Sequence, residues 1–347
     1  MSEADPLIKE ALARLLAGED LNREAARETL GAILSGQVTP AQIGGLLVAW
    51  RLKGETVEES TGFVEAMRGA CVPFKTSVAP LVDLCGTGGD VSGSINISTA
   101  ASLIVAASGA GVAKHGNRSA SSKCGSADVL ETLGVAVGLS PENGSRCLED
   151  NGFVFLFAPT YHPAMRHAGP PRKELGIRTF FNILGPLSSP AGVKRQLIGV
   201  FDDAVRETMA KVLSELGSEH VWVVHSKLDG DPVRGLDELS IAGPTRVTRL
   251  KDGVIDEFEI RPEDAGLASA SIDSLLGGDA AHNAERLVAI LDGEKGPQRD
   301  AALLNAGAAL VVADRAADIK AGVGLAAETV DSGKAAGFLA DLRGWSA

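Results

Sequence analysis

Aromatic residues, cysteines and long apolar runs are all scarce in this chain of 347 residues. Aromatic side chains make up only 4% of it, so packing must rely on Ala, Leu, Val and Gly. The four cysteines, Cys71, Cys85, Cys124 and Cys147, lie far apart, which argues against a zinc site or a disulfide framework and favours a reducing, cytoplasmic location. The longest apolar run, ASLIVAASGAGVA, is interrupted by Ser and Gly and is shorter than the roughly 20 residues that cross a bilayer, so we expect no membrane partner.

Basic residues are also fewer than acidic residues. Lys and Arg number 33 against 45 Asp and Glu, which gives a formal net charge of -12. Such a chain repels polyanions, so we expect no nucleic acid among its main partners. Any anionic ligand must therefore be bound by a local basic site.

The pattern along the chain predicts two parts. Residues 6–70 place apolar residues three and four apart in four short stretches, which predicts four amphipathic helices, and a linker with two prolines follows. From Leu81 onward, short β-like runs alternate with helical segments, which favours a mainly parallel sheet wrapped by helices. We therefore predict an α/β protein with a small all-helical domain at 1–75 and a larger α/β domain at 76–347. A basic, proline-rich segment at about 162–190 is expected to rejoin the helical domain, and a hairpin is expected around Asp252-Gly253.

The stretch DLCGTGGD, residues 83–90, follows a predicted buried strand. Glycines at the end of a parallel strand let the backbone N–H groups close on a phosphate. The stretch lacks the Gly-Lys-Ser/Thr of a Walker loop and the third glycine of a dinucleotide fingerprint. A phosphate loop of another kind and a simple tight turn both remain open.

Two further stretches favour an anion. NIST, residues 96–99, suits a helix N-terminus, whose free N–H groups attract phosphate, although capping alone would also explain it. KHGNRSASSK, residues 114–123, gathers three cations and three serines before another predicted helix start at Gly125-Ser126. That composition suits a multiply charged anion such as pyrophosphate better than a plain solvated loop.

Such anions usually arrive with Mg²⁺, which prefers hard oxygen ligands. Asp237 and Glu238 in GLDE are adjacent acids, and Ser98 adds a hydroxyl. The rival pair Asp202-Asp203 precedes no glycine-threonine loop, so we interpret it as a helix N-terminus.

Five stretches closely resemble the anthranilate phosphoribosyltransferase family of tryptophan biosynthesis. In order along the chain, they are GTGGD, NIST, KHGNRSASSKCGSADVLE, FAPTYHPAMRHAGPPRKELGIRTFFNILGPL and GLDE. The resemblance covers nearly the whole chain. It implies the nucleoside phosphorylase/phosphoribosyltransferase fold class and a pentosyltransferase that moves the phosphoribosyl group of 5-phosphoribosyl diphosphate (PRPP) to anthranilate, with release of pyrophosphate. It also implies a homodimer and two Mg²⁺ ions per monomer.

The resemblance further implies the roles of individual residues. Lys114 and Asp90 would take part in catalysis, Gly86, Asn117 and Arg172 would contact anthranilate, and Ser98, Asp237 and Glu238 would bind Mg²⁺. The PRPP site would comprise Gly86, Gly89, Asp90, Ser94, Asn96, Ile97, Ser98, Thr99, Lys114, His115, Gly116, Asn117, Arg118, Ser119, Ala120, Ser121, Ser122 and Ser126.

This sequence departs from the family pattern at three places. Ser188-Ser189 stand where Thr-Asn is usual, Tyr161 stands where a second His is common, and the link before Gly235 is longer. His115 and His162 have either a structural or a substrate-orienting role. The alternatives to the transferase are a pyrimidine-nucleoside phosphorylase-like enzyme and a non-catalytic relative that binds nucleic acid.

Overall fold

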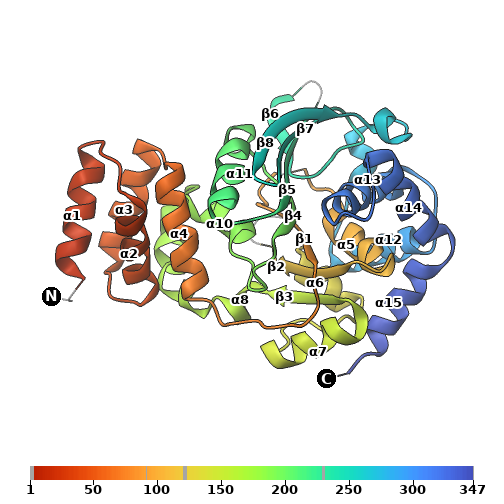
Figure 1. Ribbon diagram of the computed structural model, residues 1–347, viewed down its shortest axis with the longest axis horizontal. Helices are drawn as coiled ribbons and strands as arrows, with labels where there is room; N and C mark the ends of the chain where they lie inside the picture. The colour runs from red at the N-terminus through yellow and green to blue at the C-terminus, as the bar shows by residue number, and fades with distance from the viewer. Residues whose placement is uncertain (1–3, 91, 120–122, 229–230, 347) are drawn as a thin grey trace.

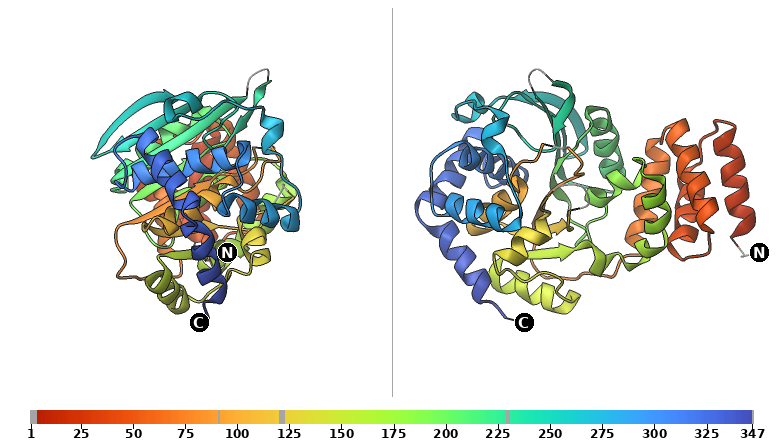
Figure 2. Two further views of the ribbon diagram at one scale, coloured as in Figure 1. Left: turned by 90° about the vertical axis from the view of Figure 1, so that its right-hand side faces the viewer. Right: turned by 180° about the vertical axis from the view of Figure 1, so that it is seen from behind.

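The computed structural model describes residues 4–90, 92–119, 123–228 and 231–346. A group of helices at the N-terminal end projects from a larger part that contains the sheet, as Figure 1 and the view from behind in Figure 2 show. None of the helices in these ranges is long and apolar enough to span a membrane.

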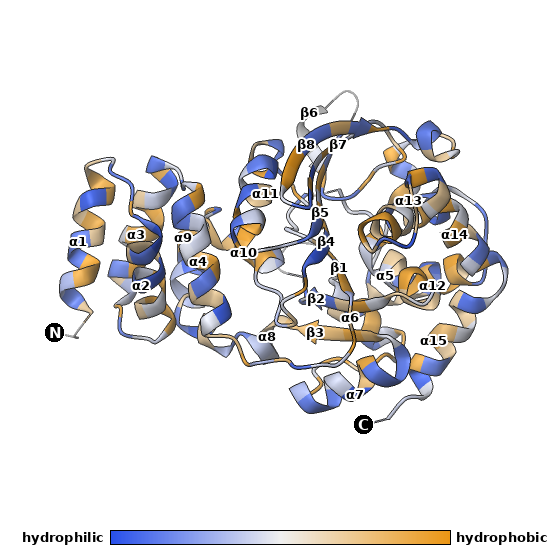
Figure 3. Cartoon of the chain, in the orientation of Figure 1, coloured by the Kyte–Doolittle hydropathy of each residue, from blue (hydrophilic) through white to orange (hydrophobic). Residues whose placement is uncertain are grey.

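The N-terminal part consists of the four predicted helices. They are α1 (Asp5–Leu16), α2 (Arg23–Leu34), α3 (Pro40–Lys53) and α4 (Val57–Gly69). Side-chain caps start α2, α3 and α4, from Asn22, Thr39 and Thr56, because these oxygens accept N–H groups that the first turn leaves free. Hydrophilic and hydrophobic residues alternate along these helices in Figure 3, as expected for helices with one solvated face.

The segment after strand β3 (Phe153–Phe157) packs on this helical part. It contains α8 (Ala158–Tyr161), a 3₁₀ turn (Pro163–His167), α9 (Gly169–Leu175) and α10 (Phe181–Leu187). Phe180 stacks on Phe63 with ring centroids 4.1 Å apart, and the edge of Trp50 meets both rings. The segment therefore shares an aromatic core with α3 and α4, which supports the predicted return at about 162–190; the domain boundaries at residues 75 and 76 stay a prediction.

An eight-stranded sheet forms the larger part, with strand order β3-β2-β1-β4-β5-β7-β8 and β6 paired with β5. Five neighbouring strands are parallel, namely β3, β2, β1, β4 and β5. The other three, β6, β7 and β8, pair antiparallel. The strands are β1 (Leu81–Gly86), β2 (Gly111–Gly116), β3 (Phe153–Phe157), β4 (Arg195–Gly199), β5 (His220–Leu228), β6 (Asp231–Leu236), β7 (Thr245–Lys251) and β8 (Val254–Ile260). The predicted fold class is confirmed, and the turn between β7 and β8 lies at Asp252-Gly253 as expected, both with positive φ.

Helices cover both faces of the sheet. Alternate residues of β1 point to opposite faces: Leu84 joins the core beneath the C-terminal helices, and Cys85 joins the core shared with the N-terminal part. The first face carries α5 (Ile97–Ala107), α6 (Ser126–Thr132), α12 (Ala280–Leu291), α13 (Pro297–Val312), α14 (Ile319–Asp331) and α15 (Lys334–Gly344). The second carries α11 (Arg206–Glu215), which a 3₁₀ turn at Asp203–Val205 precedes, and α7 (Pro141–Asn151) packs beside β3.

Two loop predictions were refined by the structure. Asp202 accepts the Ala204 N–H and begins the 3₁₀ turn before α11, so the acid pair there lies at a helix start as predicted. The longer link before Gly235 is not simply a loop, because β5 and β6 pair antiparallel through it. Asp237 is therefore the first residue after strand β6, which ends at Leu236.

Candidate active site

The glycine turn lies after β1, at the carboxyl edge of the parallel strands. Gly88 and Gly89 have φ angles of 69° and 78°, which side chains other than glycine rarely adopt. The Gly88 N–H donates to Oδ2 of Asp237 at 2.8 Å. A Cβ atom at Gly86 would lie 2.4 Å from the same oxygen, so the strand end leaves room for this carboxylate. The turn therefore packs directly against one of the two predicted metal-binding acids.

The segment from this turn to α5 holds several predicted PRPP residues. The Asp90 carboxylate accepts the Ser92 N–H at 3.3 Å, and Ser94 forms an isolated bridge with Leu276. Ile97 and Thr99 are buried in the first turn of α5, with 1% of each exposed, so their side chains face the core.

Helix α5 begins directly after Asn96, as the sequence predicted. The Asn96 side chain does not cap its own helix but joins two other segments: its Nδ2 donates to the Cys124 carbonyl at 3.2 Å, and its Oδ1 accepts Nδ2 of Asn283 at 2.9 Å. The Ser98 N–H in the first turn donates to Oε1 of Glu238 at 3.0 Å. The positive end of the helix dipole thus faces the second predicted metal-binding acid.

Lys114 lies in β2 and is buried beneath these loops. Its Nζ donates to the Leu84 carbonyl at 2.6 Å and to Oγ of Ser98 at 3.3 Å. Burial lowers the pKa of Lys114, and the negative charge of Asp83 opposes that shift. The pKa of Asp83 is raised to about 6 by its complete burial, against the effect of Lys114. When protonated, Lys114 therefore places an ammonium group beside Ser98, and Asp83 balances part of its charge.

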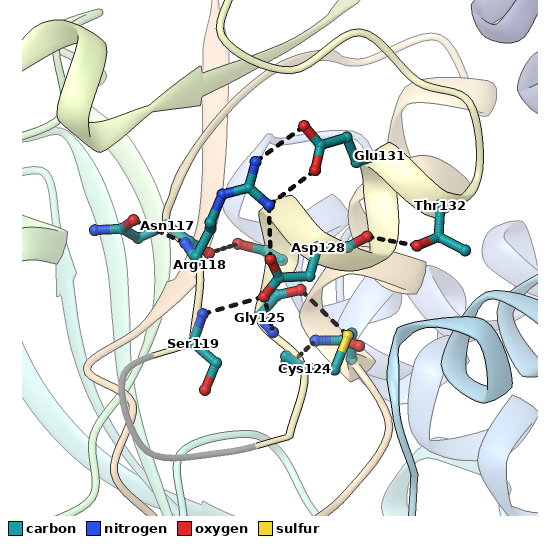
Figure 4. A network of polar contacts seen from close by, with 10 residues as sticks. Asn117, Arg118, Ser119, Cys124, Gly125, Asp128, Glu131 and Thr132 are labelled. Atoms are coloured by element: carbon teal, nitrogen blue, oxygen red, sulfur yellow. Dashed lines mark hydrogen bonds and ion pairs between the residues drawn. The ribbon is translucent and has the colours of Figure 1, made fainter.

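The cations expected together after β2 are separated in the structure. Arg118 forms ion pairs with Glu131 and Asp128, each at 2.8 Å, and these carboxylates raise its pKa. Figure 4 shows the three side chains together. Asp128 also accepts the N–H groups of Ser119 at 3.2 Å and Gly125 at 2.8 Å, and so closes the loop onto α6. The sequence reasoning did not foresee that the acids of α6 would occupy this guanidinium.

The remaining residues of this predicted loop are placed as follows. Gly116 ends β2, Ser126 begins α6, and the Ser126 hydroxyl donates to the Asn117 carbonyl at 3.2 Å. Lys123 is exposed. The predicted PRPP residues Ala120, Ser121 and Ser122 lie outside the described residues.

Asp237 and Glu238 follow β6 and lie at the edge where β1, β2 and β4 end. Burial and the negative charges of Asp90 and Glu238 raise the pKa of Asp237 well above its usual range. Burial raises the pKa of Glu238 to about 7, although Lys114 favours its ionised form. The surroundings therefore disfavour the ionised forms of both carboxyl groups, and a nearby cation would favour them. Their hard oxygens suit a divalent cation.

Within the described ranges, no three His, Cys, Asp or Glu side chains converge as a complete metal cage. Mg²⁺ characteristically uses one or two carboxylates and completes its shell with water and phosphate oxygens. The acid pair and the Ser98 hydroxyl fit that type of site.

Arg172, the predicted contact for anthranilate, lies on α9. Its guanidinium sits over the Phe181 ring, 4.7 Å from the centroid, and burial lowers its pKa. Among the described residues no acidic side chain pairs with it, and no hydrogen bond joins it to Asn117. A partly buried guanidinium without a carboxylate partner is suited to an external carboxylate.

His115 and His162 lie side by side, with ring centroids 5.2 Å apart. Nδ1 of His115 contacts the Gly185 carbonyl at 3.1 Å, and Nε2 of each ring has no partner among the described residues. Burial lowers the pKa of His115 to about 3 and also lowers that of His162, so both rings are neutral near pH 7.

Several residues next to the site were missed by the sequence reasoning. Arg178 donates to the Gly89 carbonyl and stacks on Phe201, 3.6 Å from the ring centroid. Asn305 of α13 binds the backbone just after Glu238. A basic residue near the FF pair and a polar residue within an apolar helix were visible signals, but their partners lie far away in the sequence.

Comparison with known proteins identifies the family of this chain. The family profile described as "Glycosyl transferase family, a/b domain" matches residues 78–336, and "Glycosyl transferase family, helical bundle domain" matches residues 9–71. An anthranilate phosphoribosyltransferase of Rhodopseudomonas palustris is 52% identical over 334 residues, which cover 96% of this chain and 97% of the relative.

Solved structures agree as well. The anthranilate phosphoribosyltransferase of Thermus thermophilus has a TM-score of 0.89 and 42% identity, covering 96% of this chain and 98% of its own. The Saccharomyces cerevisiae enzyme in complex with PRPP and Mg has a TM-score of 0.87 and 26% identity, covering 99% of each chain. With its profile matches, its sequence identity and its fold in agreement, this chain belongs to the anthranilate phosphoribosyltransferase family.

Proposed function

We infer that this chain transfers the phosphoribosyl group of PRPP to the amino group of anthranilate and releases pyrophosphate, as a step of tryptophan biosynthesis. One observation of the geometry supports this most strongly. Asp237 binds the glycine turn through Gly88, and Glu238 binds the start of α5 through Ser98. The acid pair thus joins the two segments that the sequence favours as the diphosphate site.

In the reaction the amine nitrogen forms a bond to C1 of the ribose while the bond from C1 to the diphosphate oxygen breaks. The electrons of that bond leave with pyrophosphate, and the nitrogen loses one proton. An aromatic amine is already neutral near pH 7, so the main task of the protein is to stabilise the leaving group. We propose that Lys114 does so together with N–H groups of the glycine turn other than those of Thr87 and Gly88, which bind Gly199 and Asp237. Such an effect is worth a few kcal/mol per donor.

We propose that Ser98, Asp237 and Glu238 bind Mg²⁺ and that two ions are held per monomer. When bound, Mg²⁺ would neutralise diphosphate charge. The raised pKa values of Asp237 and Glu238 support this assignment, because a cation would offset the burial of both carboxylates and the repulsion from Asp90. Asp90 adds a third negative charge nearby, and we propose that it helps to orient the diphosphate site.

We propose that Arg172 binds the carboxylate of anthranilate, with Asn117 and Gly86 at the same site. The support is that its guanidinium is oriented by Phe181 and free of an acidic partner among the described residues. The neutral rings of His115 and His162 would add hydrogen-bonding nitrogens without adding charge.

The assembly is proposed to be a homodimer formed through the helical domain, in the cytoplasm. The support is exposed apolar surface there: 71% of Leu16 in α1 and 80% of Leu52 in α3 are accessible. Light scattering of Leu52→Asp against wild type tests this, and a monomeric wild type would contradict it.

The activity itself is tested by mixing the protein with Mg²⁺, PRPP and anthranilate and following the loss of anthranilate fluorescence. The variant Asp237→Asn/Glu238→Gln should reduce turnover at least about a hundredfold, because charge stabilisation of the leaving group is lost. Glu10→Gln, an exposed acid of α1, is the control and should match wild type. Release of a free base from a pyrimidine nucleoside and phosphate, with no loss of anthranilate, would overturn the proposed activity.

A further inference from the structure

The two acids of the proposed Mg²⁺ site lie on irregular backbone. Asp237 and Glu238 follow β6, which ends at Leu236, and precede β7, which begins at Thr245. Buried backbone groups outside a helix or a strand ladder need other hydrogen-bond partners. The partners of this segment therefore determine where the two carboxylates lie.

Asn305 supplies two of these partners from α13. Its side chain is fully buried, its Oδ1 accepts the Leu239 N–H at 3.0 Å, and its Nδ2 donates to the Leu239 carbonyl at 2.8 Å. The second hydrogen of Nδ2 goes to the Ala301 carbonyl at 2.9 Å. Both donors of the amide and one acceptor site are thus used, and within the described part of the chain its partner outside α13 is the Leu239 backbone, next to Glu238.

The opposite side of the segment is held by hydroxyl groups. Oγ of Ser226 donates to the Glu238 carbonyl at 2.7 Å, and Oγ1 of Thr245 accepts the Ser240 N–H at 3.1 Å. The two hydroxyls also contact each other at 2.7 Å. Together with Asn305, they hold the backbone of three consecutive residues from two sides.

A close approach to the sheet completes the support. A Cβ atom at Gly199, the last residue of β4, would lie 1.5 Å from the Asp237 carbonyl oxygen, so the segment lies directly on the strand end. The peptide groups are thereby fixed, and the two carboxyl groups extend toward Gly88 and Ser98.

We propose that Asn305 is a positioning residue that sets the affinity of the acid pair for Mg²⁺, acting through the backbone of Leu239. Burying an amide inside an apolar helix is costly, and here its hydrogen bonds to Leu239 offset that cost. Without the amide, two buried backbone groups lose their partners, and the carboxylates beside them are no longer preorganised for a cation. The inference rests on the proposed function, because it takes Asp237 and Glu238 as the metal ligands.

The test measures Mn²⁺ binding to the full chain by the loss of the electron paramagnetic resonance signal of free Mn²⁺ relative to a protein-free sample with the same PRPP, and anthranilate is omitted. Asn305→Ala should weaken Mn²⁺ binding about tenfold and raise the Mg²⁺ concentration for half-maximal activity by a similar factor. The KM for anthranilate at saturating Mg²⁺ should stay unchanged. Thr329→Val is the matched control, since it removes a buried hydroxyl whose partner among the described residues, the Leu325 carbonyl, lies within α14.

Ser226→Ala gives an independent measurement, because it removes the support of the Glu238 carbonyl and should weaken Mn²⁺ binding in the same direction. It also serves if Asn305→Ala does not fold. A folded Asn305→Ala that binds Mn²⁺ as wild type does overturns the inference, and so does unchanged binding by Ser226→Ala if the first variant is unfolded.

The variant Asp237→Asn/Glu238→Gln separates this inference from the proposed function. If it binds Mn²⁺ as tightly as wild type does, the proposed metal site fails and the inference fails with it. If it loses Mn²⁺ while Asn305→Ala retains normal affinity, only the inference about Asn305 fails.

Discussion

The two arginines Arg172 and Arg118 differ in their interaction partners. Arg172 has an aromatic ring beneath it and no carboxylate partner among the described residues, whereas Arg118 is held by two acids. The two arginines are equal in charge, but of the two only Arg172 can bind an external carboxylate without first breaking an ion pair. Specificity for an acidic aromatic substrate would thus reside on α9.

Replacement of Arg172 tests that view. Arg172→Ala should raise the KM for anthranilate about 10- to 100-fold, since a hydrogen bond to a charged group contributes roughly 1.5–3 kcal/mol. Arg172→Lys should recover only part of the loss, because an ammonium cannot form the planar pair of hydrogen bonds. Steady-state fluorescence assays measure both, and Lys173→Ala, an exposed neighbour, is the control. An unchanged KM in Arg172→Ala would exclude this residue from the anthranilate site.

The buried Asp83 predicts a dependence of stability on pH. Its pKa is about 6 in the folded protein against 3.8 for an unperturbed Asp, so the folded state binds the proton more tightly. The stabilisation is fully present below about pH 4 and is lost as pH rises through about 6. Asp83→Asn removes this titration, so its thermal midpoint relative to wild type should increase from pH 5 to pH 7.5, by the equivalent of about 1–1.5 kcal/mol. A constant difference across that range would contradict the raised pKa.

At the scale of elements, the site depends on strand ends that come very close to a loop. Gly199 ends β4 directly under the Asp237 carbonyl. Gly199→Ala should therefore displace the acid pair and reduce kcat by more than about tenfold, since overpacking of this kind costs roughly 1–3 kcal/mol. Gly44→Ala in α3, where a Cβ meets open space, is the control and should keep full activity. Full activity of Gly199→Ala would show that the acid segment can shift without loss.

The helical part and the α/β part are joined by aromatic packing between elements. Phe180 is buried between Trp50 of α3 and Phe63 of α4. Phe180→Ala should reduce the free energy of unfolding by roughly 3–5 kcal/mol, because it leaves a cavity in that shared core. Val254→Ala, on a side chain that is 65% exposed, should change it little. Chemical denaturation of both variants measures the difference, and equal stability would mean that the two parts do not depend on this contact.

For the whole molecule, ligand binding should be visible as stabilisation. PRPP with Mg²⁺ at about 100 times its Kd should stabilise the native state by about 2.7 kcal/mol and raise the thermal midpoint by a few degrees. With a chelator in place of Mg²⁺ the shift should shrink, and Asp237→Asn/Glu238→Gln should show the smaller shift under both conditions. Differential scanning fluorimetry measures this, and a shift independent of Mg²⁺ in wild type would contradict the metal assignment.

Much of the fold could be predicted from local pattern. The spacing of apolar residues located the four N-terminal helices, and the Asp252-Gly253 turn located the β7–β8 hairpin because few residue pairs adopt its positive φ angles. The glycine turn could be located as well, since glycine acts through the conformation of its own backbone. The start of α5 was also located, although the Asn96 side chain bonds to other segments and does not cap the helix.

The arrangement of the site could not be derived from local pattern. Gly88 and Asp237 are 149 residues apart in the chain, and their contact depends on β1 lying beside β4 in the sheet. The burial of Lys114, the pairing of Arg118 with the acids of α6 and the contact of Asn305 with Leu239 likewise depend on which elements become neighbours. Local residue types determine the conformation of a segment and its chemical groups, whereas strand order and helix packing determine which of those groups meet, because charges and hydrogen bonds act only over a few ångströms.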